Sequence, residues 1–206
     1  MASFCPVFVD KYDPLKAGSI DGTDEYPHDK GVVRALNAVY KPNRFVKGAP
    51  ECTVFVGRLN PNTVEETIED SLKDFGKILS VRIVRDIVTG FSKCYGFVEF
   101  SDPYEARDAC KNGNKIVIDD HEILVDSEKE RTLKGWIPRR LGGGIGGKRE
   151  SGQLRFGGKD RPFKKPIQTL HQAQDYKDFG FKDYSRNSRR DKGRDDYQNR
   201  NRDRYR

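Results

Sequence analysis

The sequence predicts an α+β domain of order β-α-β-β-α-β, in which two helices back four antiparallel strands, between an N-terminal arm and a disordered basic C-terminal tail. Strand and helix periodicities follow one another in that order within residues 51–128 and are not continued on either side. The 206-residue chain is 34% hydrophobic and 34% charged, so a good part of it should lie outside a packed core.

The first strand of the domain is expected at residues 53–58. The helix after it should begin at Thr63, because Glu66 three residues later completes a capping-box pattern. Three apolar residues at i, i+4 and i+7, namely Ile68, Leu72 and Phe75, give this helix one buried face. Gly76 is expected to end it. The later elements are expected at 79–85 (strand), 86–93 (polar loop), 93–100 (strand), 104–110 (helix), and 116–118 with 122–125 (last strand and its lead-in).

The strand at residues 93–100 carries an unusual set of aromatic side chains. Alternate residues of a strand point to opposite faces, so Tyr95 and Phe97 share one face while Val98 and Phe100 face the core. Phe55, on the first strand, should add a third ring to the platform. Exposed rings side by side are typical of a surface on which nucleotide bases stack.

Residues 1–50 form the arm, which is rich in turn-forming residues and poor in core residues. A short helix is predicted within it, capped by Asp29 and ended by Pro42. Its apolar side needs a cover, so we expect the arm to dock on a protein partner or on its own domain. The residues on that side are Val32, Val33, Leu36, Val39 and Tyr40.

Charge is divided unevenly along the chain. Residues 1–127 carry a net charge of −5, whereas residues 128–170 carry 12 Lys and Arg against 4 Asp and Glu, a net charge of +8. Residues 171–206 form a low-complexity tail of net charge +4. We therefore expect the flexible, glycine-rich extension at 129–170, rather than the domain, to attract a polyanion.

The sequence gives little support for an enzyme, a metal-binding protein or a membrane protein. No catalytic constellation, cofactor site or small-molecule site is expected, and the scattered Cys and His residues predict no metal site. The string at 142–148 imitates a phosphate-binding loop, but Arg149 stands where Ser or Thr is needed. Residues 1–9 do not have the pattern of a signal peptide, and no apolar run is long enough for a membrane span.

Two motifs resemble the RNA recognition motif family, which has a ferredoxin-like fold. Residues 93–100 (KCYGFVEF) match its octapeptide, with Cys94 in place of a glycine. Residues 54–59 (VFVGRL) resemble its hexapeptide, with Arg58 where family members often carry Asn. The two departures put the preference for particular bases in question, not the fold.

A narrower resemblance covers residues 11–166. Residues 130–144 (ERTLKGWIPRRLGGG) resemble the segment after this motif in the 70-kilodalton protein of the major spliceosome. Residues 12–24 and 150–158 are instead similar to the related 35-kilodalton family of the minor spliceosome's small nuclear ribonucleoprotein (snRNP). The resemblance implies a nuclear, non-enzymatic subunit that binds a small nuclear RNA stem-loop, works with other snRNP and spliceosome proteins, and supports splicing of minor-class introns at the 5′ splice site.

By the family's pattern the three rings stack on loop bases, Lys93 meets a phosphate, and the basic residues from Arg131 onward follow the RNA stem. The complete set of expected RNA-binding residues is Phe55, Arg58, Arg85, Lys93, Tyr95, Phe97, Arg131, Lys134, Trp136, Arg139 and Arg140. The alternatives are a major-spliceosome snRNP protein, a general splicing regulator, or a module that binds peptides. Retention of the rings argues against the last, and the scarcity of Arg-Ser dipeptides argues against a general regulator.

Overall fold

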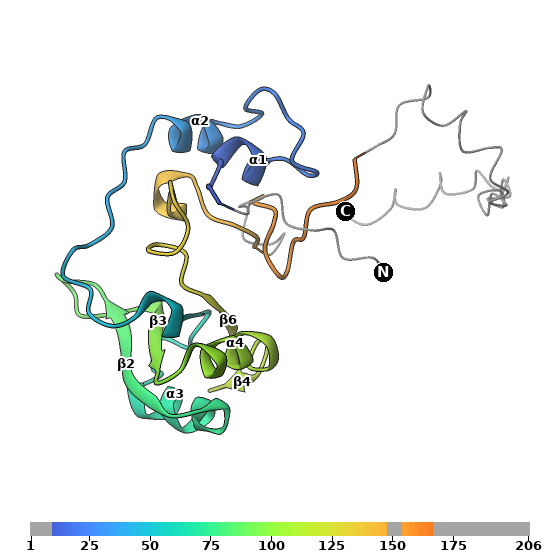
Figure 1. Ribbon diagram of the computed structural model, residues 1–206. Coiled ribbons are helices and arrows are strands. Elements are labelled where there is room, and N and C mark those ends of the chain that lie inside the picture. Colours follow the sequence, from blue (N-terminus) through green and yellow to red (C-terminus); the bar gives the residue numbers. More distant parts are fainter. Residues whose placement is uncertain (1–9, 148–153, 167–206) are drawn as a thin grey trace, which may run out of the picture. The chain divides into compact units, whose positions relative to one another are not determined.

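The computed structural model describes residues 10–147 and 154–166 (Figure 1). The predicted tail at 171–206, residues 1–9 and Arg149 lie outside the described residues. The elements are α1 (Pro14–Gly18), α2 (Lys30–Leu36), η1 (Pro50–Cys52), β1 (Thr53–Gly57), α3 (Glu65–Leu72), η2 (Lys73–Phe75), β2 (Ile78–Arg85), β3 (Ser92–Phe100), α4 (Pro103–Asn112), β4 (Val117–Ile118), β5 (His121–Glu122), β6 (Leu124–Ser127) and η3 (Arg139–Leu141).

The main sheet has four strands in the order β2-β3-β1-β6, and every neighbouring pair is antiparallel. Phe55 of β1 lies opposite Phe97 of β3 on one side and Asp126 of β6 on the other. Arg82 of β2 in turn lies opposite Phe97. Together with helices α3 and α4, this sheet confirms the predicted α+β, ferredoxin-like architecture.

The core of this domain follows the predicted alternation along the strands. Val54, Val56, Val98 and Phe100 are fully buried, as the face opposite the rings requires. Both helices add small or branched residues to the same core: Ile68 and Leu72 from α3, and Ala106 and Ala109 from α4. Each buried aliphatic side chain contributes about 1.5–3 kcal/mol relative to an exposed one, so this core positions the strands firmly.

The start of α3 differs from the predicted capping box. The helix begins at Glu65, and its N-cap residue is Val64, which makes no capping hydrogen bond through its side chain. Thr63 is buried, and its hydroxyl donates to Asp119 Oδ2 at 2.6 Å. Because that hydroxyl is already engaged in holding a distant turn, it does not cap the helix.

The predicted last strand and its lead-in are two separate structures. Residues 117–118 and 121–122 pair only with each other, as the short ladder β4–β5. Asp119 and Asp120 between them both have positive φ, 47° and 63°, as a two-residue turn with the twist of a hairpin requires. The chain then enters β6 at Leu124, one residue after the buried Ile123.

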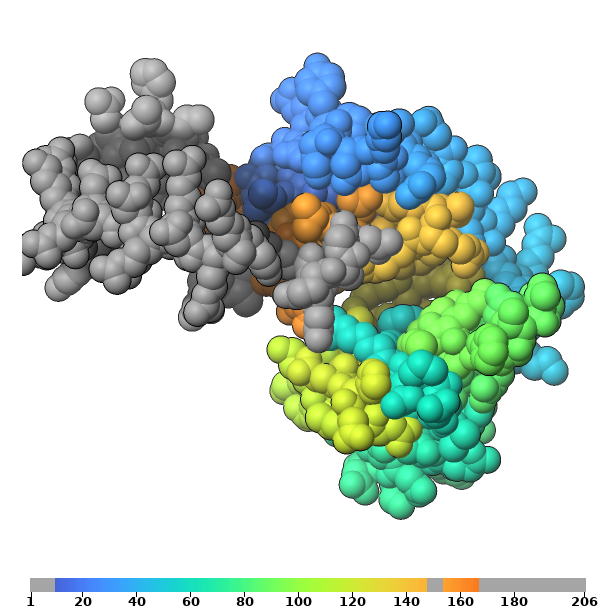
Figure 2. Space-filling model, turned by 180° about the vertical axis from the view of Figure 1, so that it is seen from behind, coloured from blue at the N-terminus to red at the C-terminus, as the bar shows by residue number. Residues whose placement is uncertain are grey.

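The arm and the extension form a second small core. Tyr12 and Ala17 of the arm are buried with Ala35 of α2 and Ile137 of the extension. Figure 2 shows the blue arm lying against the gold and orange extension. Helix α2 is capped by Asp29 as predicted, but it ends at Leu36, well before Pro42.

Long-range hydrogen bonds join the same two segments. The Tyr12 hydroxyl donates to the Gly144 carbonyl at 2.8 Å, and the Phe156 amide donates to the Ala17 carbonyl at 2.7 Å. The buried Arg155 guanidinium donates to the Gly142 carbonyl and pairs with Asp29. The described part of the extension is therefore folded against the arm, and not flexible as predicted from the sequence.

The glycines of the extension also have a different role from the one expected. A Cβ on Gly142 would collide with the carbonyl oxygen of Gly31 in α2, and one on Gly143 would collide with that of Ile137. Gly142 additionally has a φ of 92°, which L side chains rarely adopt. The run of glycines therefore permits close backbone packing rather than flexibility.

Candidate nucleic-acid interface

The three predicted rings form one cluster on the sheet face that α3 and α4 leave uncovered. Phe55 lies 5.7 Å from Tyr95 and 5.8 Å from Phe97, measured between ring centroids, and the other two are 6.3 Å apart. These separations fall in the range of favourable aromatic contacts. The rings support one another from two adjacent strands, so they present an organised aromatic surface.

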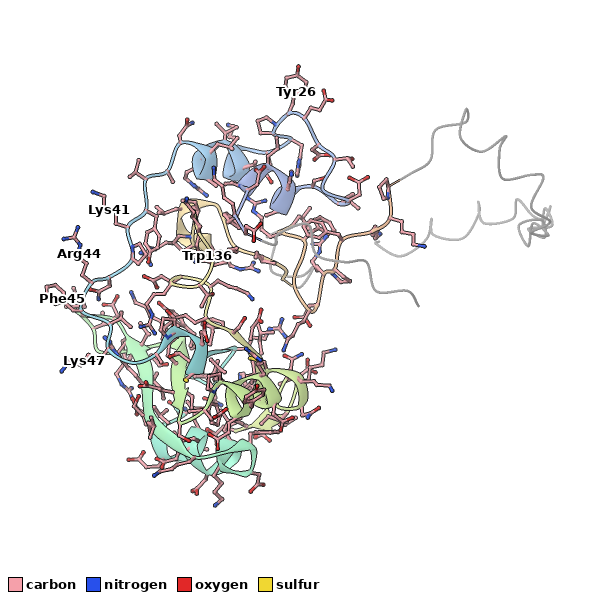
Figure 3. The ribbon with its side chains drawn as sticks, in the orientation of Figure 1. Tyr26, Lys41, Arg44, Phe45, Lys47 and Trp136 are labelled. Atoms are coloured by element: carbon pink, nitrogen blue, oxygen red, sulfur yellow. The ribbon has the colours of Figure 1, made fainter. Side chains whose placement is uncertain are left out.

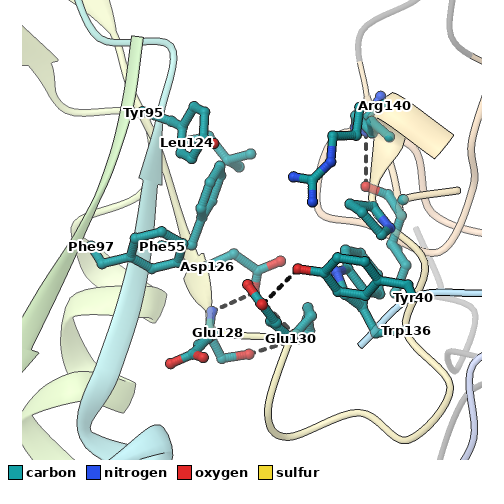
Figure 4. Close-up of a pocket in the computed structure, with 16 residues that line it drawn as sticks. Tyr40, Phe55, Tyr95, Phe97, Leu124, Asp126, Glu128, Glu130, Trp136 and Arg140 are labelled. Atoms are coloured by element: carbon teal, nitrogen blue, oxygen red, sulfur yellow. Dashed lines mark hydrogen bonds and ion pairs between the residues drawn. The ribbon is translucent and has the colours of Figure 1, made fainter. Parts of the chain in front are cut away.

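The cluster forms one wall of a cavity of about 380 Å³. The other wall consists of Tyr40 from the segment after α2 and of Trp136, Arg140 and Ile145 from the extension (Figure 4). The three rings were predicted to be exposed on the sheet, and the structure shows them half-buried because they line this cleft. Aromatic groups on both walls leave room for planar ligands between them.

The second core holds the far wall in position. Trp136 packs edge-on against Tyr12, with ring centroids 5.0 Å apart and planes at 62°. Arg140 places its guanidinium 5.3 Å from the centroid of the Tyr40 ring. The Tyr40 hydroxyl donates to Glu130 Oε1 at 2.6 Å. Burial, followed by this bond to Glu130, raises the pKa of Tyr40 to about 12, so its phenol is neutral at physiological pH.

The floor of the cleft carries acidic groups, two of which have basic partners. Glu128 is buried and receives two hydrogen bonds from the Arg131 guanidinium, at 2.6 and 2.7 Å. Asp126 lies 3.6 Å from the Lys129 ammonium. This floor offers little net attraction to a phosphate group. The cleft suits bases and sugars better, and phosphates would be favoured at its rim.

Comparison with known proteins agrees with this geometry. Residues 54–124 match the family model described as the RNA recognition motif. The U11/U12 small nuclear ribonucleoprotein 35 kDa protein of Danio rerio is 62% identical over 156 residues, which cover 76% of this chain and 75% of that protein. The chain belongs to this 35 kDa protein family. Members of this family are ribonucleoprotein subunits with an RNA recognition motif, not enzymes.

Other relatives match over different lengths. The U11/U12 35 kDa protein of Homo sapiens is 60% identical over 157 residues, which cover 76% of this chain but 64% of that protein. The U1 small nuclear ribonucleoprotein 70 kDa homolog of Schizosaccharomyces pombe is 40% identical over 118 residues, which cover 56% of this chain and 45% of that protein. The predicted resemblance to the 35 kDa family, with the 70 kDa proteins as more distant relatives, is confirmed.

Three predicted RNA-binding cations of this family member lie within or beside the motif, and each has an acidic partner. Arg58 pairs with Asp160 of the extension. Arg85 lies 3.0 Å from Glu65 of α3, and Lys93 lies 3.5 Å from Asp86 in the loop before β3. None of the three lines the cleft. Their charges are therefore partly balanced within the chain.

The predicted residues of the extension divide into two groups. Arg131 and Arg139 serve the fold: Arg131 pairs with Glu128, and Arg139 donates to the carbonyl of Ile145 and is partly buried. Lys134 and Arg140 are exposed and available to a ligand.

Tyr40 lines the cleft, a place that its sequence pattern does not predict. Its pattern indicated the apolar side of the arm helix, but that helix ends at Leu36 and Tyr40 turns into the cleft. The hydrogen bond that holds Tyr40 in this place joins it to Glu130, 90 positions away. No local sequence pattern indicates a contact between residues so far apart.

Metal clusters and membrane-spanning helices are both absent from the described ranges. No group of three or more His, Cys, Asp or Glu residues there could hold a metal ion. Within the same ranges, the helices are too short or too polar to cross a bilayer.

Proposed function

We propose that this chain is the RNA-binding subunit of the minor spliceosome's U11/U12 snRNP. In this role it binds a stem-loop of a small nuclear RNA and supports splicing of minor-class introns at their 5′ splice sites. It acts in the nucleus, with other snRNP and spliceosome proteins as partners. The proposal joins the family membership to the chemistry of the cleft.

One observation carries the RNA-binding part. The ring cluster of Phe55, Tyr95 and Phe97 faces Trp136 and Tyr40 across a cavity of about 380 Å³. Every base has a π-face, and stacking on an aromatic ring contributes roughly 1–3 kcal/mol per base. A single-stranded loop can turn its bases out into such a cleft, whereas a duplex stem keeps its bases stacked inside. The cleft therefore favours the loop of a stem-loop.

The stem is assigned to the rim of the cleft. Arg140 is exposed and lines the cleft, and Lys134 is exposed on the same segment, two residues before Trp136. A phosphate backbone leaving the loop would meet these cations directly after the rings. The earlier expectation that the whole basic extension follows the stem is thus narrowed to its exposed members.

The protein partners are assigned to the outer side of the arm. In α2, Val32 and Ala35 are buried, but Val33 and Leu36 stay 43% and 48% exposed. Val39 follows at 86% exposed. These three apolar residues on one short segment are available to another protein of the particle.

The test is crosslinking in nuclear extract, followed by sequencing of the RNA bound to the full-length chain. The proposal expects reads concentrated in the loop of one small nuclear RNA of the minor spliceosome. Reads concentrated in a small nuclear RNA of the major spliceosome would favour the alternative snRNP. Reads spread over many messenger RNAs would favour a general splicing regulator. Absence of RNA above a no-irradiation control would overturn RNA binding.

A further inference from the structure

The chain between α2 and the motif contains a basic aromatic strap, defined here as residues 41–47 (KPNRFVK). Lys41, Arg44 and Lys47 are exposed, and Phe45 among them is 88% exposed. Figure 3 shows these four side chains projecting outward from the strap, on the side away from Trp136. An aromatic residue placed among cations is the composition of surfaces that bind single-stranded nucleic acid.

The backbone of the strap is held in place although its side chains are free to reach outward. The Asn43 amide donates to Glu130 Oε1 at 3.2 Å, and the Asn43 side chain accepts from the Phe45 amide at 3.0 Å. Directly after the strap, the Gly48 carbonyl accepts from Arg131 at 2.7 Å and the Ala49 amide donates to Glu99 at 3.0 Å. A fixed backbone reduces the entropy that a ligand must remove on binding.

The strap is continuous with the cleft. Tyr40, immediately before it, is part of the cleft wall, and Glu130 binds both the Tyr40 hydroxyl and the Asn43 amide. A nucleic acid whose bases enter the cleft would therefore have its backbone within reach of the strap. The position favours a polyanionic strand over an acidic peptide, because the same strand would occupy both surfaces.

The strap also supplies what the cleft lacks. Among the described residues, Lys41, Arg44 and Lys47 have no acidic group within ion-pair distance. Several of the cations first expected to bind RNA are instead paired within the chain, as Arg58 is with Asp160 and Arg131 with Glu128. A paired cation must give up its acidic partner before it can neutralise a phosphate, whereas an unpaired one can neutralise a phosphate and release the counterions of the RNA directly.

We propose that the strap is a second RNA-contacting site, in which Lys41, Arg44 and Lys47 bind backbone phosphates and Phe45 stacks on a base outside the cleft. This inference rests on the proposed RNA-binding function, which it extends to a segment before the motif. It assigns most of the electrostatic attraction between the protein and the RNA phosphates to the linker that joins the arm to the domain.

The test compares full-length variants in binding to a fluorescein-labelled RNA hairpin with a mixed-sequence single-stranded loop, at several salt concentrations. The strap variant is Lys41→Gln, Arg44→Gln, Lys47→Gln. Its matched control is Lys77→Gln, Lys111→Gln, Lys115→Gln, which removes the same charge from exposed positions that do not line the cleft. Phe45→Ala is compared with Tyr26→Ala, which removes an arm ring that is 81% exposed.

The expected result is a flatter salt dependence for the strap variant. Each phosphate contact adds about 0.7–0.9 to the slope of log affinity against log salt, so three lost contacts lower it by about 2–3. At about 0.1 M salt this corresponds to about a 100-fold loss of affinity. Phe45→Ala should lower affinity about five-fold or more, because stacking contributes roughly 1–3 kcal/mol per base. Both controls should change affinity by about two-fold at most.

Two outcomes separate this proposal from the proposed function. Suppose that the wild-type chain binds the hairpin, but the strap variant and its control have the same slope of log affinity against log salt. The strap then makes no phosphate contacts, and only this proposal is overturned. If the wild-type chain does not bind the hairpin at any salt concentration, the proposed RNA binding fails as well. Loss of affinity in both triple variants to the same degree would mean that only net charge matters, and would also overturn the strap as a site.

Discussion

Replacement of Tyr12 by Ala should unfold the second core while leaving the RNA recognition motif intact. Tyr12 is 2% exposed, packs against Trp136 at 5.0 Å, and donates a 2.8 Å hydrogen bond to the Gly144 carbonyl. Truncation of a buried aromatic residue to Ala costs about 3–5 kcal/mol. That loss is comparable to the whole stability of a small core, so the extension should detach from the arm.

The chain provides its own probe for this experiment. Trp136 is the only tryptophan in the sequence and packs against the second core, so its fluorescence during urea unfolding reports on that core. Hydrogen exchange of peptides from β1 and β3 reports on the motif. The free energy of unfolding measured by Trp136 fluorescence should fall by about 3–5 kcal/mol, or the transition should disappear. Hydrogen exchange in β1 and β3 should be unchanged.

Two control variants sharpen the result. Tyr12→Phe keeps the ring but leaves the Gly144 carbonyl without its partner, which should cost about 1–3 kcal/mol. Tyr26→Ala removes a ring that is 81% exposed and should shift the transition by less than about 0.5 kcal/mol. An unmoved Trp136 transition in Tyr12→Ala, or an equal loss of protection in β1 and β3, would refute the reasoning that the two cores are separate.

Two further predictions concern the exposed cations near Trp136 and the Tyr40 phenol of the far wall. The variant Lys134→Gln, Arg140→Gln should lower the slope of log affinity against log salt by about 1.4–1.8, since both cations are exposed; a slope equal to that of Lys111→Gln, Lys115→Gln would contradict this. The raised pKa of Tyr40, about 12, means that the folded state retains a proton that an unfolded tyrosine loses near pH 10. Its contribution to stability is complete below pH 10 and declines towards pH 12, so the difference in urea midpoint between the wild type and Tyr40→Phe should shrink over that window; a constant difference would argue against the assignment.

The motif was predictable because its signals are local. Alternation along residues 93–100 fixes which side chains face the core, and the structure buries Val98 and Phe100 while the rings face the cleft. The capping box at Thr63 failed because a hydroxyl can serve a tertiary contact instead, here with Asp119, and the local pattern cannot distinguish the two uses.

The second core was not predictable from local patterns. It depends on contacts between residues far apart in sequence: Tyr12 and Gly144 are 132 positions apart, and Asp29 and Arg155 are 126 apart. Neither segment has enough apolar residues to indicate a domain by itself. The net charge of residues 128–170 overstated how many cations could meet RNA. It counts buried cations such as Arg155 together with exposed ones such as Lys134.

The most direct test of the account is the affinity of the double variant Tyr95→Ala, Phe97→Ala for the RNA hairpin. Both rings line the cleft, and each stacked base contributes roughly 1–3 kcal/mol, so affinity should fall about 30-fold or more. The matched control, Tyr26→Ala, Tyr104→Ala, removes two rings that are 81% and 76% exposed, and should bind like the wild type. Hydrogen exchange in β1 should be unchanged in both variants. Wild-type affinity in a folded Tyr95→Ala, Phe97→Ala protein would contradict the claim that bases stack in the cleft.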